Sequence, residues 1–195
     1  MSELKMPAGL QALIDRAGGA DKSLPPIDKW DPPFCGDLDM RIASDGQWYY
    51  MGTPITRQAL VNLFASVLKR DDDGKYYLVT PVEKIGLTVD DAPFLAVEMD
   101  YQPGEDGEGP LFTFRTNTGD VIAAGPEHPM RFENEEATGG LKPYIHVRGK
   151  LEALLARPLL YELADHMIEH DVDGGSVLGI ESNGAFFPAE RLEDK

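Results

Sequence analysis

The chain has 195 residues, of which 42% are hydrophobic and 27% charged, a composition that excludes collagen-like and wholly disordered proteins. Its 34 acidic and 18 basic residues give a formal net charge of −16, which disfavours nucleic-acid and anionic-membrane partners but permits a small anion in a local basic pocket. Cys35 is the single cysteine and no apolar run reaches the roughly 18 residues of a membrane helix, so we expect a cytoplasmic protein without disulfides.

The first part of the chain is predicted to form a helical segment and a proline-rich arm. Residues 1–22 form an N-terminal helical segment, with Leu10, Leu13 and Ile14 on one side of an amphipathic helix. Four prolines follow between residues 23 and 35, and their density disfavours both helix and strand. We expect an N-terminal α+β domain over residues 23–86 and a C-terminal domain over residues 87–195.

The N-terminal domain is predicted to contain a hairpin, a helix and a further strand. Residues 40–51 alternate around an Asp-Gly turn and indicate a hairpin. A helix capped by Thr56 follows, because apolar residues then recur at helical spacing. These residues are Leu60, Leu63, Phe64, Val67 and Leu68. The run Asp71-Asp72-Asp73-Gly74 is expected to stop the helix before a strand at residues 75–80; turn formation explains this run better than weak cation binding.

The C-terminal domain is predicted to be mostly extended, with one long helix. Short apolar runs separated by turn residues indicate strands at residues 84–101, 111–115, 121–124, 130–132, 144–148, 177–180 and 185–187. The Gly-rich acidic segment Gln102–Pro110 is expected to be a hairpin tip. Residues 151–170 predict the helix, with Leu159, Leu160, Leu163 and Met167 on its buried face. Pro158 indicates either a kink or a true start near Arg157.

Residues 57–79 repeat at residues 157–179, at a constant shift of 100 positions. The identical residues include an arginine before the helix, leucines within it and an Asp-x-Asp-Gly run after it. The arginine and the Asp-x-Asp-Gly run are not required by amphipathicity, which favours duplication over chance similarity between two helices. We therefore predict an α+β fold of two related halves with a duplicated strand-helix-strand motif.

Several long motifs resemble the bacterial domain-of-unknown-function 1285 family. They include the runs Gly36–Ile42, Asp45–Arg57, Tyr76–Lys84 and Tyr144–Leu163, so the resemblance covers about residues 25–188. It implies a duplicated core whose C-terminal half is superficially like a pleckstrin-homology fold. It also implies a ligand site between the halves, for a nucleotide-like molecule in signalling. None of these motifs is a known catalytic signature.

The segment His166-Met167-Ile168-Glu169-His170 matches the H-x-x-E-H pattern of inverted zinc peptidases. On a helix, His166 and His170 would share one face and could hold a metal, with Glu169 as the base. The sequence indicates no third ligand, and a solvated or capping role explains both histidines better than a metal site does. Cys35 is expected to be an inert packing residue, because nothing in the sequence places it beside a histidine.

The scarce basic residues are the remaining candidates for a binding site. Arg57, Lys84, Arg148 and Arg157 stand at the ends of apolar elements, where they could bind a phosphate or carboxylate. Tyr77 and Tyr144 could stack on a ligand or form hydrogen bonds with it. The alternative for each cation is an ion pair with an acidic residue of the chain.

These observations predict a non-enzymatic sensor or adaptor that needs no cofactor or structural metal. It would bind a small anionic, nucleotide-like ligand between the two halves and relay this to a protein partner in signal transduction. Two rival hypotheses are a structural protein-protein interaction module and a metal-dependent hydrolase that uses the histidine motif.

Overall fold

The structure, a computed structural model, describes residues 6–16, 24–104 and 109–192. Contacts within the chain divide it into two compact units, Met1–Asp90 and Asp91–Lys195. Each unit combines helix with sheet, so the α+β prediction is confirmed. None of the helices within the described residues is long and apolar enough to cross a membrane.

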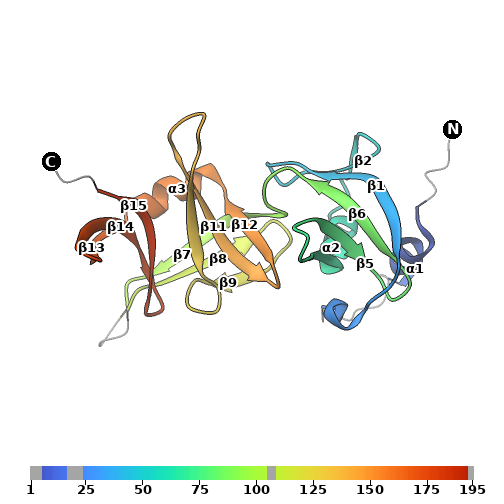
Figure 1. The fold of residues 1–195 in the computed structure, drawn as a ribbon, viewed down its shortest axis with the longest axis horizontal. Helices are drawn as coiled ribbons and strands as arrows, with labels where there is room; N and C mark the ends of the chain where they lie inside the picture. Colours follow the sequence, from blue (N-terminus) through green and yellow to red (C-terminus); the bar gives the residue numbers. More distant parts are fainter. Residues whose placement is uncertain (1–5, 17–23, 105–108, 193–195) are drawn as a thin grey trace. The chain divides into compact units, whose positions relative to one another are not determined.

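The N-terminal unit contains a six-stranded sheet in the order β3-β2-β1-β6-β5-β4 (Figure 1). Its strands are β1 (Phe34–Ile42), β2 (Trp48–Tyr50), β3 (Thr53–Pro54), β4 (Leu68–Arg70), β5 (Tyr76–Val79) and β6 (Lys84–Val89). Neighbouring strands are antiparallel except for β1 and β6, which run parallel at the centre. The expected hairpin is confirmed, because Met40 pairs with Tyr50 and Ile42 with Trp48.

Helix α2 (Gln58–Ser66) covers one face of this sheet and closes the core. The Phe64 ring stacks on the Trp48 indole with their centroids 6.2 Å apart, and both side chains are fully buried. The helix begins at Gln58 after Arg57, and no side chain caps it, so the predicted Thr56 cap is wrong. It also ends earlier than expected, because Leu68 belongs to β4.

Helix α1 (Ala8–Arg16) packs against α2 and against the turn that joins β5 to β6. Leu10 is fully buried, and its backbone N–H donates a hydrogen bond of 2.8 Å to the Glu83 carboxylate. Glu83 is itself buried, so the chain places a carboxylate at the positive end of the helix dipole. The proline-rich arm that follows α1 contains one short helical turn, η1 (Ile27–Lys29).

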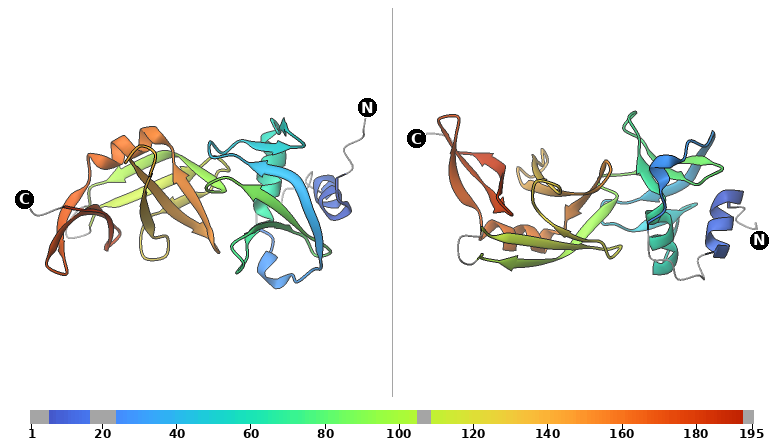
Figure 2. Two further views of the ribbon diagram at one scale, coloured as in Figure 1. Left: turned by 45° about the horizontal axis from the view of Figure 1, so that its top comes forward. Right: turned by 90° about the horizontal axis from the view of Figure 1, so that it is seen from below.

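The C-terminal unit contains a second six-stranded sheet, in the order β10-β11-β12-β7-β8-β9. Figure 2 shows that this sheet is strongly curled. Its strands are β7 (Phe94–Gln102), β8 (Leu111–Thr116), β9 (Val121–Ala123), β10 (Met130–Asn134), β11 (Leu141–Arg148) and β12 (Leu151–Leu155). The hairpin of β7 and β8 is confirmed; residues 105–108 of its predicted tip lie outside the described residues.

The predicted long helix over residues 151–170 is wrong, because this segment forms three elements. They are strand β12, helix α3 (Arg157–Ala164) and strand β13 (Ile168–Val172). Pro158 stands in the first turn of α3, where proline is tolerated, and so marks the true start of the helix. Leu159 and Leu163 are buried as predicted, where α3 packs against β7 and β11.

A three-stranded sheet completes the C-terminal unit, in the order β13-β14-β15. Strands β14 (Gly175–Ser182) and β15 (Ala185–Arg191) confirm the two final predicted strands and extend them. An Asp-Gly turn, in which Asp173 and Gly174 have φ angles of 55° and 77°, joins β13 to β14. These positive φ angles are those of a two-residue hairpin turn.

The duplication is visible as the same order of elements in both units. Helix α2 is followed by β4, a turn with the run Asp-x-Asp-Gly, β5 and β6, and helix α3 is followed by β13, a turn with the same run, β14 and β15. In both units the three strands form an antiparallel meander. The Asp-x-Asp-Gly run therefore turns one strand into the next, and does not stop a helix as predicted.

Candidate functional site

The candidate ligand contacts are the six residues named from the sequence. The structure places Arg57, Tyr77 and Lys84 in the N-terminal unit, and Tyr144, Arg148 and Arg157 in the C-terminal unit.

Tyr77 and Lys84 meet beside the first Asp-x-Asp-Gly turn. They lie on neighbouring strands, and the Lys84 ammonium sits 4.1 Å from the centre of the Tyr77 ring. Each is held by a carboxylate of the turn: Lys84 forms an ion pair with Asp71, and the Tyr77 hydroxyl donates a 2.5 Å hydrogen bond to Asp73. The turn thus brings a cation, an aromatic ring and two carboxylates into one cluster.

The charges in this cluster shift its pKa values in opposite directions. The hydrogen bond to the Asp73 carboxylate raises the pKa of Tyr77 to about 12, because ionised Tyr77 would face a second negative charge. The same bond lowers the pKa of Asp73, and the Lys84 ammonium lowers that of Asp71. Both turn carboxylates are therefore ionised at neutral pH, and Tyr77 keeps its proton.

Phe34 belongs to the surroundings of this cluster, although the sequence did not single it out. Its ring meets the Tyr77 ring edge-on with centroids 6.0 Å apart, and 57% of the residue is exposed. Phe34 pairs with Lys84 across the parallel strands β1 and β6. The only sequence signal was its position at the end of the proline-rich arm. Cys35 beside it is exposed, so the prediction of a packing residue is wrong; its thiol donates a hydrogen bond to the Pro33 carbonyl.

Arg57 stands at a different place in the same unit, as the residue that precedes helix α2. It is exposed, and its own carbonyl accepts the hydrogen bonds of the first helical turn from Leu60 and Val61. Within the described residues its guanidinium makes no ion pair. Its counterpart Arg157 is the first residue of α3 and is also exposed.

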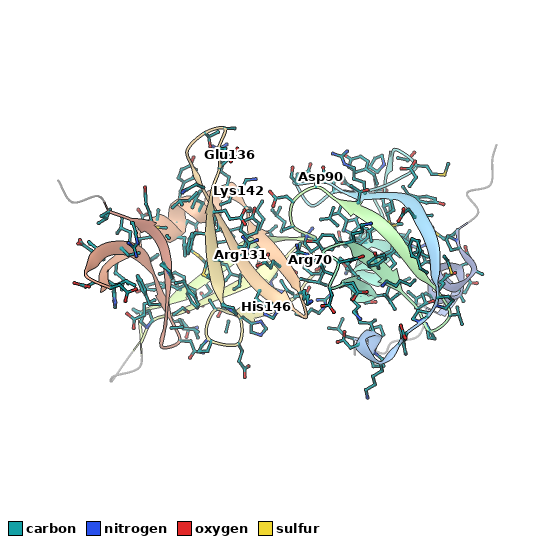
Figure 3. All side chains as sticks on the ribbon, in the orientation of Figure 1. Arg70, Asp90, Arg131, Glu136, Lys142 and His146 are labelled. Atoms are coloured by element: carbon teal, nitrogen blue, oxygen red, sulfur yellow. The ribbon has the colours of Figure 1, made fainter. Side chains whose placement is uncertain are left out.

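Tyr144 lies on β11 at the centre of a polar network on the curled sheet. Its hydroxyl donates a 2.7 Å hydrogen bond to Asp91, and the Arg131 guanidinium lies 4.0 Å from the centre of its ring. Arg131 also binds Glu152 through two hydrogen bonds of 2.6 and 2.7 Å, and Lys142 pairs with Asp91 at 2.8 Å. Figure 3 shows Arg131 and Lys142 on this part of the sheet.

The electrostatics of this network favour a fixed arrangement. Burial and the bond to Asp91 raise the pKa of Tyr144, and the bond to Glu152 raises that of Arg131. The bond to Asp91 likewise raises the pKa of Lys142. Arg131 also pairs with Glu133, two positions away on the same strand. It was not predicted from the sequence because its main partner, Glu152, is 21 positions away along the chain.

Arg148 closes β11, and its guanidinium group is held by a carboxylate at one edge and an aromatic ring at one face. It donates a 2.7 Å hydrogen bond to Asp120, and it lies 4.9 Å from the centre of the Phe94 ring. Lys84 and Arg148 therefore both have carboxylate partners from the chain itself, the alternative that the sequence had left open for each of them.

The geometry expected for the H-x-x-E-H motif is wrong. His166 lies in the loop after α3 and packs against the tilted Tyr101 ring, with centroids 3.9 Å apart. His170 lies on strand β13 and stacks on Phe186, with centroids 4.4 Å apart. Since successive side chains of a strand point to opposite faces, Glu169 and His170 diverge. The described residues contain no cluster of three side chains suited to a metal ion.

Comparison with known proteins covers nearly the whole chain. Residues 25–92 match the N-terminal domain of DUF1285, described as a domain of unknown function, and residues 93–189 match its C-terminal domain. No curated protein matches the chain.

Two solved structures resemble the chain, and both are of DUF1285 family proteins. The one from Silicibacter pomeroyi DSS-3 has 45% sequence identity and a TM-score of 0.81, over 92% of this chain and 95% of that one. The one from Shewanella baltica OS155 has 27% identity and a TM-score of 0.49, over 66% and 91% of the two chains. With both domains matched and a relative at 45% identity, the chain belongs to the DUF1285 family, whose function is unknown.

Proposed function

We propose that this protein is a non-enzymatic, cytoplasmic sensor or adaptor that binds a small anionic, nucleotide-like ligand. The anchor is the N-terminal end of α2, where Arg57 holds the anionic group. The observation that carries the proposal is the exposed Arg57 at a helix end without a side-chain cap, repeated as Arg157 at the start of α3.

An arginine at this place is electrostatically unusual. The N-terminal end of a helix is the positive end of its dipole, where cations are disfavoured and anions are stabilised. In a chain with 34 acidic residues, ion pairing would be the simplest way to neutralise Arg57, yet no described residue pairs with it. An incoming phosphate or carboxylate would balance both the guanidinium and the helix dipole.

The other predicted contacts have a different part in this proposal. Lys84 and Arg148 are paired with Asp71 and Asp120, so an anion reaches them only by displacing a carboxylate. In the N-terminal unit, exposed Phe34 and its neighbour Tyr77 lie at a different place from Arg57, so they have no part in holding the anionic group. We therefore assign primary binding to Arg57, with Arg157 as its equivalent in the second unit.

Thermal unfolding with a panel of anions tests the proposal. The panel contains inorganic phosphate, AMP, ATP and cyclic nucleotides, added to the full chain at low salt. A ligand at 100 times its dissociation constant stabilises the fold by about 2.7 kcal/mol, which for a protein of this size raises Tm by roughly 5 to 10 °C.

Variants separate specific binding from general charge effects. Arg57→Gln is expected to abolish the largest ligand-induced rise in Tm. Arg157→Gln is expected to reduce the smaller rise in Tm that comes from the second unit. Lys75→Gln is the matched control, because it removes one exposed positive charge from the same unit. No stabilisation by any member of the panel, or equal shifts in all three variants, contradicts the proposal.

A further inference from the structure

Strand β13 is an edge of the three-stranded sheet, and it pairs only with β14 among the described strands. Residues 168–171 are all exposed, and the ring contact of His170 is with Phe186 of the same sheet. The strand contains no proline or bulge to block an added strand, and its charged residues are the carboxylates Glu169 and Asp171.

The hairpin turn determines which backbone groups face this open edge. In a two-residue hairpin, the residues that flank the turn exchange both backbone hydrogen bonds, and bonded and non-bonded pairs then alternate. Val172 pairs with Gly175 next to the turn, so Val172, His170 and Ile168 direct their N–H and C=O groups toward β14. The N–H and C=O groups of Glu169 and Asp171 consequently point outward, in the pattern that an added strand requires.

The side chains of β13 give this edge a distinct chemistry on each face. Glu169 and Asp171 lie on one face; Glu169 accepts a hydrogen bond from the Ser176 hydroxyl, and Asp171 accepts one from the Gly174 N–H. Ile168, His170 and Val172 lie on the other face. One face is thus acidic and the other mainly apolar.

We propose that β13 binds an extended basic segment of a partner protein by strand addition. The partner would carry lysine or arginine at alternate positions, opposite Glu169 and Asp171, and apolar residues between them. Main-chain hydrogen bonds supply affinity in this mode and the alternating side chains supply specificity. A second copy of this chain is a poorer occupant, because symmetric antiparallel pairing about His170 sets Glu169 against Asp171.

A synthetic peptide tests this inference directly on the full chain. The probe is a blocked seven-residue peptide of alternating lysine and valine, and its binding is followed by fluorescence anisotropy. The same peptide with glutamate in place of lysine is expected not to bind. A version with N-methyl groups on alternate amides, on the edge that meets β13, is also expected not to bind, because it cannot complete the backbone hydrogen bonds.

Two substitutions at one position separate charge from backbone bonding. Glu169→Thr removes the carboxylate and keeps the outward N–H, whereas Glu169→Pro removes both without breaking a bond to β14. We expect the proline variant to bind the lysine peptide about tenfold more weakly than the threonine variant, the effect of one lost hydrogen bond. Circular dichroism and Tm show whether both variants keep the fold.

Hydrogen exchange supplies a readout that does not depend on a variant. At saturating peptide, exchange at Glu169 and Asp171 should slow strongly, while His170, already bonded to β14, changes little. Equal binding by both Glu169 variants, equal binding of the lysine and glutamate peptides, or no binding at millimolar peptide overturns the proposal. A parent dimer that Glu169→Pro converts to a monomer overturns it in favour of a second copy.

Discussion

Replacing Gly9 by alanine is expected to detach helix α1 from the N-terminal unit. In an isolated helix this substitution stabilises by about 1 kcal/mol, because alanine has the higher helix propensity. In this protein the new Cβ would lie 2.7 Å from the Thr80 hydroxyl oxygen and against the Glu83 carboxylate. Glu83 cannot move away without losing its hydrogen bond to Leu10.

The size of the effect follows from what the docked helix contributes. Full burial of Leu10 is worth about 1.5 to 3 kcal/mol, and a hydrogen bond to a charged carboxylate about 1.5 to 3 kcal/mol. Set against the gain in propensity, the Gly9→Ala variant should lose about 2 to 5 kcal/mol of docking free energy. The lower value corresponds to roughly 30-fold faster exchange of the α1 amides.

Hydrogen exchange over residues 6–16, measured by mass spectrometry, checks this prediction. The control is Ala12→Gly, at an exposed position of the same helix, which lowers propensity without a clash. If contact with Glu83 dominates, Gly9→Ala speeds exchange more than the control does. If Gly9→Ala slows exchange or raises the free energy of unfolding, the reasoning is refuted.

Three further outcomes are expected. The raised pKa of Tyr77 contributes stability that is complete below pH 10 and is lost as pH rises to about 12. The difference in ultraviolet absorbance between the parent and Tyr77→Phe should therefore titrate near pH 12. Leu163→Ala should cost about 2 to 5 kcal/mol in urea unfolding, and Leu63→Ala clearly less, because only Leu163 is fully buried. A double-mutant cycle of Arg131→Gln and Glu152→Gln should give a coupling free energy of about 1 kcal/mol that added salt reduces. A coupling free energy of zero would contradict the view that this ion pair stabilises the fold.

The sequence predicted most strands because their signal is local. Alternation and Asp-Gly turns located the last residues of β1 and also β2, β5 and β14, and the repeat at a shift of 100 positions located the shared order of elements. The prediction of one long helix failed because a run of leucines fits both the strand period of two residues and the helical period of 3.6. Leu151, Ala153 and Leu155 are buried at alternate positions of a strand, and the helical spacing starts only after Pro158.

The candidate site was predictable only as a list of residue types. Scarcity drew attention to Lys84 and Arg148, but their partners Asp71 and Asp120 are 13 and 28 positions away. Such pairings depend on which strands become neighbours, and local patterns do not contain that information. The position of Arg57 could be predicted, because standing directly before a helix is a local property of the sequence.

The strand order of the first sheet has a consequence for how this unit is made. Strand β6 lies between β1 and β5, although it is the last of the six strands to be synthesised. Until residues 84–89 leave the ribosome, the three-stranded meander β1–β2–β3 and the hairpin β4–β5 lack the strand that joins them. The parallel pairing of β1 with β6 also closes a loop of more than forty residues, which is slow compared with hairpin formation. Assembly of the N-terminal unit should therefore be a late, abrupt event during translation, whereas the meander of β13, β14 and β15 can form strand by strand as it emerges.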